Sequence, residues 1–208
     1  VVQFDAKNSA LTKFIDDKEN DLLAKPAGGQ RIGNIGFGMF PRISPDGKFC
    51  SIDIDSPNTP VKGSAHLQLA GVITLLCASQ KTEIVQPNVA LVEKTKLTAP
   101  NLELTITEVQ AARPAEKTEG LPQAPLSLTL RSQRELDEVA EIRFFRPDGS
   151  EIPSRRSGTS KMAIFGAMKV DWSYDLQEKV DAATVKIFLW TDLEKKRVPF
   201  DLTIKSGL

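Results

Sequence analysis

The stretch Met168-Lys-Val-Asp-Trp-Ser-Tyr-Asp-Leu176 alternates apolar and polar side chains at every step. Because successive side chains of a β-strand point to opposite faces, this pattern predicts a strand with one buried face. Turn sequences such as Ser44-Pro-Asp-Gly47 separate similar stretches along the chain. Short alternating strands with this punctuation are typical of sandwiches and barrels, so we predict an all-β fold. Other alternating stretches are Phe49–Asp55, Leu102–Ile106, Leu126–Leu130 and Val198–Ile204.

Residues 111–125 interrupt this pattern, because they contain three prolines, one glycine and almost no large apolar side chain. Such a composition is typical of linkers. We therefore predict two domains of β-sandwich type, residues 1–112 and residues 125–208, joined by a linker at residues 113–124.

The second half of the chain resembles a known architecture. The strand predicted to end at Leu176 is followed by the turn Glu178–Ala183 and then by a further strand, Thr184–Trp190. This arrangement is similar to the corner between strands E and F of immunoglobulin-like (Ig-like) domains. Residues 125–208 thus resemble the Ig-like β-sandwich domains of exported bacterial proteins. The resemblance implies a final strand after Trp190, but an architecture of this kind does not specify a function.

Composition excludes several classes of partner. Lys plus Arg equals Asp plus Glu at 27 each, so the chain lacks the basic excess of nucleic-acid-binding proteins. The longest apolar run, Val72–Ala78, is far shorter than the roughly 20 residues of a transmembrane helix. The sequence begins Val-Val-Gln-Phe without a methionine, which is typical of a trimmed or signal-processed chain. We expect an extracytoplasmic location, periplasmic or secreted.

The two cysteines and the single histidine are candidates for chemistry. By strand parity, Cys50 and Cys77 both face the predicted core, where they form either a disulfide or two buried thiols. His66 faces solvent on the same argument, and no nucleophile motif accompanies it. Two inward cysteines and one outward histidine do not make a zinc site, and we expect no cofactor.

The acidic segment Asp16-Asp-Lys-Glu-Asn-Asp21 lies within residues 9–24, which fit either a hairpin or an amphipathic helix. Acidic residues and an asparagine at the tip favour the hairpin. Its hard oxygen atoms suit calcium, although a solvated turn is the simpler interpretation. The candidate calcium ligands are Asp16, Asp17, Asn20 and Asp21.

An aromatic pair breaks the expected pattern of the strand Thr184–Trp190. Val185, Ile187 and Leu189 form its inward set, yet Phe188 and Trp190 occupy the outward face. Such a face either packs against the other domain or binds a partner. Arg155 and Arg156, in the preceding Gly-Ser-Thr-rich segment, are candidates to rim this patch.

Two functions follow from these features. The absence of clustered catalytic residues favours an exported binding, adhesion or scaffold module that contacts a protein or glycan partner. The alternative is a carboxylate-dependent hydrolase using Asp53 and Asp55 or Asp16, or a piece that carries the auxiliary domains of a larger secreted enzyme. A cleft at these carboxylates with a raised pKa would favour the hydrolase.

Overall fold

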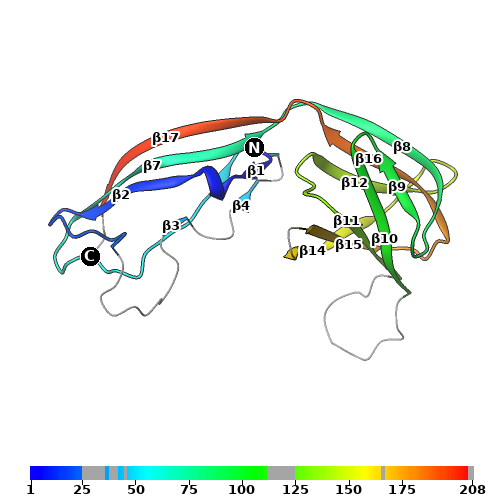
Figure 1. The fold of residues 1–208 in the computed structure, drawn as a ribbon, viewed down its shortest axis with the longest axis horizontal. Coiled ribbons are helices and arrows are strands. Elements are labelled where there is room, and N and C mark those ends of the chain that lie inside the picture. Colours follow the sequence, from blue (N-terminus) through cyan, green and yellow to red (C-terminus); the bar gives the residue numbers. More distant parts are fainter. Residues whose placement is uncertain (25–35, 38–41, 45, 112–124, 165–166, 206–208) are drawn as a thin grey trace. The chain divides into compact units, whose positions relative to one another are not determined.

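The computed structural model confirms an all-β chain built from antiparallel sheets (Figure 1). The one helical element among the described residues is the 3-10 turn η1 (Ala6–Asn8). No helix in this part of the chain has the length and apolar character needed to cross a membrane. The structure describes residues 1–24, 36–37, 42–44, 46–111, 125–164 and 167–205.

The chain divides into two compact units, and the first unit contains both the N-terminal and the C-terminal segments of the chain. Unit 1 comprises Val1–Ser79 and Asp192–Leu208, and unit 2 comprises Gln80–Thr191. The strands of unit 1 are β1 (Gln3–Phe4), β2 (Ala10–Asp16), β3 (Gly36–Phe37), β4 (Arg42–Ile43), β5 (Cys50–Ser51), β6 (Ile54–Asp55), β7 (His66–Cys77) and β17 (Glu194–Lys205).

Strand β7 is the centre of unit 1. It pairs with β17 over its whole length and, on its other side, with β1 and then β2. Gly71 sits in the middle, opposite Leu11 in β2 and Phe200 in β17. A Cβ atom at Gly71 would lie 2.4 Å from the carbonyl oxygen of Ala10, so the close approach of β2 requires glycine here. The pairing register shifts beside it, between Leu11 and Lys13.

Unit 2 consists of two antiparallel sheets. The first has the order β14-β15-β11-β10-β9, and the second has the order β13-β12-β16-β8. We call them the five-stranded and the four-stranded sheet. The strands are β8 (Lys81–Ala90), β9 (Lys96–Ala99), β10 (Leu102–Ala111), β11 (Leu126–Ser132), β12 (Val139–Phe145), β13 (Glu151–Ile152), β14 (Ser154–Ile164), β15 (Ala167–Leu176) and β16 (Ala182–Trp190).

Apolar side chains from both sheets of unit 2 form one core, which confirms the sandwich-type packing. The ring of Phe144, on the four-stranded sheet, meets that of Tyr174, on the five-stranded sheet, edge to face at 5.6 Å. The alternation read from the sequence accounts for this core, since every second residue of β11, β15 and β16 is buried. From these three strands the buried side chains are Leu126, Leu128, Leu130, Val170, Trp172, Tyr174, Leu176, Ala183, Val185, Ile187 and Leu189.

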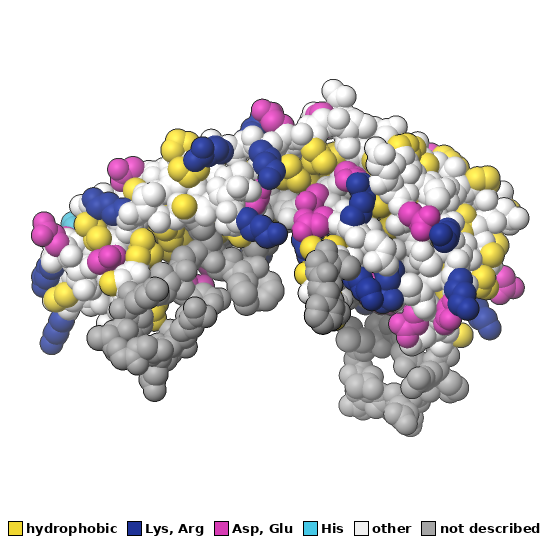
Figure 2. All heavy atoms as spheres, viewed as in Figure 1, with side chains coloured by type: hydrophobic (Ala, Val, Ile, Leu, Met, Phe, Trp, Pro, Cys, Tyr) yellow, Lys and Arg dark blue, Asp and Glu magenta, His cyan; other side chains and the backbone are white. Residues whose placement is uncertain are grey.

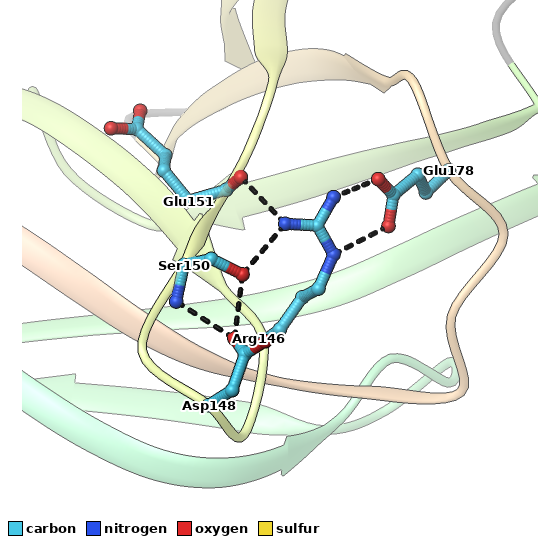
Figure 3. Close-up of polar contacts among 5 residues, drawn as sticks. All are labelled: Arg146, Asp148, Ser150, Glu151 and Glu178. Atoms are coloured by element: carbon cyan, nitrogen blue, oxygen red, sulfur yellow. Dashed lines mark hydrogen bonds and ion pairs between the residues drawn. The ribbon is translucent and has the colours of Figure 1, made fainter.

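Arg146 closes the turn between β12 and β13 (Figure 3). Its guanidinium group donates to both carboxylate oxygens of Glu178, to Ser150 Oγ at 2.8 Å and to the carbonyl oxygen of Glu151 at 3.0 Å. Asp148 accepts from the backbone N–H of Ser150 at 2.9 Å. The turn Arg146-Pro-Asp-Gly149 is therefore tied to the connection between β15 and β16.

The units divide the chain at points that differ from the predicted domain boundary. The predicted linker, residues 113–124, lies outside the described residues, but the strands on either side of it belong to one sheet. Ala111 at the end of β10 is paired with Leu126 at the start of β11. The final strand, β17, pairs with β7 in unit 1, and β8 takes the place beside β16. Local composition does not reveal these long-range pairings.

Backbone hydrogen bonds show the local structure of residues 9–24 and of the stretch Phe49–Asp55. Residues 9–24 form a strand and turn, with Ile15 bridged to Asp21, so the hairpin interpretation is confirmed and the helix is wrong. The single strand predicted at Phe49–Asp55 is instead two short strands, β5 and β6, which pair with β4 and β3 respectively.

Candidate functional site

The outward face of the four-stranded sheet carries three aromatic rings among charged side chains. Phe188 and Trp190 lie on β16, opposite the buried side chains of Val185 and Ile187, and Phe145 lies on β12. All three rings are half-buried. We call the set of Phe145, Phe188 and Trp190 with Lys81, Arg143 and Lys186 the cation–aromatic face.

Each ring of this face has a cation above it. Lys81 Nζ lies 4.5 Å from the ring centroid of Trp190, and Lys186 Nζ lies 4.8 Å from that of Phe145. The guanidinium carbon of Arg143 lies 5.4 Å from the centroid of Phe188. Cation–π pairs at such distances contribute about 0.5–1 kcal/mol each at exposed sites. The half-burial of the rings therefore comes in part from the sheet's own cations.

Acidic side chains balance two of these cations. Lys186 forms an ion pair with Glu83 at 2.9 Å. Arg143 forms ion pairs with Glu141 at 2.8 Å and with Glu151 at 3.7 Å, and the hydrogen bond that it donates to Glu141 is the main cause of its raised pKa. Over the side of the molecule that Figure 2 shows, basic and acidic side chains are interspersed in the same way.

Arg155 and Arg156, the predicted rim of the aromatic patch, lie on β14 in the five-stranded sheet. Arg155 pairs with Asp175 at 3.3 Å, and the guanidinium carbon of Arg156 lies 4.6 Å from the ring centroid of Trp172. The structure thus places these arginines on a different sheet from Phe188 and Trp190. The cations that surround the patch are Lys81, Arg143 and Lys186. They lie close to the rings because of the cross-strand register of β8, β12 and β16, which nearness in the sequence does not reveal.

The carboxylate of Asp16 is buried in unit 1, and backbone N–H groups hold it. The residue is 1 % exposed, and its carboxylate accepts hydrogen bonds from the N–H of Val61 at 2.8 Å, of Asn20 at 2.9 Å and of Lys18 at 3.0 Å. Ser64 Oγ donates to it at 3.2 Å. The bond from Val61 is the largest of the causes that lower the pKa of Asp16. A lowered pKa is the opposite of what a general acid of a hydrolase requires.

The remaining candidate calcium ligands also form hydrogen bonds within unit 1. Asp17 accepts from the N–H of Ala65 at 2.9 Å, and Asp21 accepts from the N–H of Leu23 at 2.8 Å. Asn20 donates through its side-chain amide to the carbonyl oxygen of Thr59. Within the part of the chain that the structure describes, no three His, Cys, Asp or Glu side chains come together as a metal site.

The other candidates for chemistry also lie apart. Cys50 and Cys77 are half-buried free thiols on β5 and β7, and burial raises the pKa of the Cys50 thiol. Asp53 and Asp55 are exposed, and Asp53 faces Arg42 at 4.0 Å. His66 is exposed, as expected, with Nδ1 4.0 Å from a carboxylate oxygen of Asp17.

An open groove of about 720 Å³ lies over the outward side of β9, β10 and β11, in unit 2. Sequence reasoning missed it. The alternation placed polar residues of Leu102–Ile106 and Leu126–Leu130 outward, but concavity depends on how the strands and turns are arranged. The groove is lined by Thr98, Ala99, Asn101, Leu102, Glu103, Thr105, Thr107, Arg131, Ser132, Gln133 and Arg134.

Comparison with known proteins adds no relative. No protein-family model matches the sequence, and neither a curated protein nor a solved structure matches it at a significant level.

Proposed function

We propose that this chain is an exported binding, adhesion or scaffold module, and that the cation–aromatic face is its contact surface for a protein partner. The observation that carries the proposal is the row of half-exposed rings on the outward face of β12 and β16, each beneath a cation. A strand face that meets only water is normally polar, so these rings call for an explanation beyond solubility.

The chemistry of the face suits burial against a protein. Aromatic and arginine side chains are enriched at protein interfaces and dominate their binding energy. Burying a charge is costly unless it is paired, and Arg143 and Lys186 already have acidic partners on the same sheet. A partner covering this face would therefore desolvate few unpaired charges.

Strand order supports an Ig-like architecture for unit 2. In chain order, β10, β11, β12, β13, β14, β15 and β16 occupy the places of strands A, B, C, C′, D, E and F of a variable-type domain. Strand β8 lies beside β16, where strand G would lie. Ig-like modules of this kind commonly serve as binding domains on cell surfaces, and an extracytoplasmic location in bacteria fits the same proposal.

The test is capture of a partner from cells that produce the protein, with the full chain as bait. The double variant Phe188→Ser, Trp190→Ser should lose the partner, and the matched control Phe49→Ser should retain it. Phe49 is 73 % exposed and lies in unit 1, so its substitution removes an exposed aromatic ring that is not part of the cation–aromatic face.

Folding of the double variant is checked by far-UV circular dichroism and by the fluorescence of the remaining Trp172. A folded double variant that captures the same partner as the wild-type chain would refute the proposal. If the double variant unfolds, Lys81→Glu with Arg143→Glu tests the same face, because reversing both charges disrupts the contact surface while the rings stay in place. Retention of the partner by that variant would equally refute the proposal.

A further inference from the structure

The groove over β9, β10 and β11 carries a second site, and we infer that it binds a neutral oligosaccharide. It lies on the five-stranded sheet, whereas the cation–aromatic face lies on the four-stranded sheet. Its volume of about 720 Å³ falls within the range of small-molecule sites.

All three charged residues that line the groove have partners. Arg131 makes a bidentate ion pair with Asp171, at 2.7 and 2.8 Å. Glu103 pairs with Lys96 at 3.0 Å, and Arg134 pairs with Glu138. The groove therefore offers no unbalanced charge, so an anionic or cationic ligand would gain little there and would lose its hydration.

The neutral polar side chains of the groove, in contrast, keep free hydrogen-bonding capacity. Among the described residues, the side chains of Thr98, Asn101, Thr105 and Gln133 have no hydrogen-bond partner. Two hydroxyl groups and two amide groups can both donate and accept, which is what the hydroxyl groups of a sugar require. Threonine methyl groups add small apolar contacts for the C–H faces of a sugar ring.

A β-bulge shapes one side of the groove. The register between β10 and β11 shifts between Ile106 and Glu108, so Thr107 is the extra residue and has no cross-strand partner. Thr107 is held by a hydrogen bond from its hydroxyl to the carbonyl oxygen of Thr129. Bulges of this kind redirect a side chain next to functional sites, and here Thr107 joins the lining.

The backbone at the end of the groove supports the role of Asn101. This residue has φ of 57°, in the left-handed region, and forms the turn between β9 and β10. Asparagine tolerates this conformation, as glycine does. Asn101→Gly therefore removes the amide while keeping the turn, which makes it a clean probe of the ligand contact.

The experiment titrates the ¹⁵N-labelled chain, residues 1–208, with cellohexaose, xylohexaose, laminarihexaose and chitohexaose, with hexagalacturonate as the charged comparison. We expect saturable amide shifts at Thr98, Asn101, Thr105 and Gln133 with a neutral hexasaccharide. Each of Thr105→Val and Asn101→Gly should weaken the Kd about 2- to 12-fold, the worth of one neutral hydrogen bond. Ser127→Ala, on the same sheet face outside the groove, should bind as the wild type does.

Three results would overturn the inference: no neutral hexasaccharide binds, the groove variants bind unchanged, or hexagalacturonate binds more tightly than the neutral probes. The Phe188→Ser, Trp190→Ser variant should bind the hexasaccharide normally, because its substitutions lie on the other sheet. Loss of the protein partner and loss of the sugar are thus separate outcomes.

Discussion

Replacing Gly71 with alanine should destabilise unit 1, because the new Cβ has no room. It would lie 2.4 Å from the carbonyl oxygen of Ala10 and 3.1 Å from both Leu11 Cα and the Phe200 ring. Since real Cβ atoms keep at least 3.0 Å, β2 must move by about 0.6 Å, the difference between 3.0 and 2.4 Å. Two of these neighbouring atoms are backbone, which cannot rotate away.

The magnitude follows from two opposing terms. Overpacking of this kind destabilises the folded state by about 1–3 kcal/mol. Replacing glycine with alanine also reduces the conformational entropy of the unfolded chain, which stabilises the protein by about 0.5 kcal/mol. We expect a net loss of about 0.5–2.5 kcal/mol in the free energy of unfolding. Gly158→Ala is the matched control. There the Cβ meets Ser173 at an ordinary 3.5 Å, so this strand substitution should be neutral or mildly stabilising.

Hydrogen exchange measured by mass spectrometry is the appropriate assay, because the two tryptophans, Trp172 and Trp190, lie in unit 2 and do not report on unit 1. Peptides covering β2 and β7 should exchange about 2- to 60-fold faster in Gly71→Ala, since 1.4 kcal/mol corresponds to a factor of ten. Unchanged protection in β7, or an equal loss of stability in Gly158→Ala, would refute the close-packing argument.

Three further predictions follow from individual contacts. Asp16→Asn should lower the stability of unit 1 near pH ~7, because the pKa of Asp16 is lowered in the folded state. The stabilisation by the ionised carboxylate is present above the unfolded-state pKa of about 4. It is lost as the pH falls through the folded-state pKa. The difference between wild type and Asp16→Asn, followed by urea unfolding and circular dichroism, should therefore shrink toward pH ~3, and a constant difference would contradict the assignment. Arg146→Lys should lower the stability of unit 2 by about 1 kcal/mol in tryptophan-monitored unfolding, because lysine cannot form the partly exposed bidentate pair with Glu178. An unchanged stability would show that this bidentate pair is dispensable. Intact mass without reductant should correspond to two free thiols at Cys50 and Cys77, with alkylation faster after unfolding; a chain lighter by two hydrogen atoms would show a disulfide instead.

Side-chain alternation carried most of the fold prediction, because it reports a local property. The buried sides of β11, β15 and β16 were readable from the sequence, as was the outward position of Phe188 and Trp190. Partnership between strands was not readable, because it depends on residues far apart in the chain. The pairing of β17 with β7, and of β8 with β16, has no local signature.

The same distinction explains the outcome for the sites. The acidic residues Asp16 and Asp17 suggested a metal, but both accept hydrogen bonds from backbone N–H groups. Two of these donors, Val61 and Ala65, lie 45 and 48 residues later in the chain. Arg155 lies in the segment that precedes the aromatic patch in the sequence, but the pairing of β14 with β15 places it on the other sheet. The groove arises from a turn, a bulge and three strands together, which no single stretch encodes.

The most direct test of the account is whether residues 80–191 fold alone. The structure predicts that this fragment unfolds cooperatively, with a buried Trp172 and an amide spectrum that matches unit 2 within the full chain. The fragment of residues 125–208 should stay unfolded, because it lacks β8 beside β16 and β10 beside β11. A folded fragment 125–208 together with an unfolded fragment 80–191 would contradict the account.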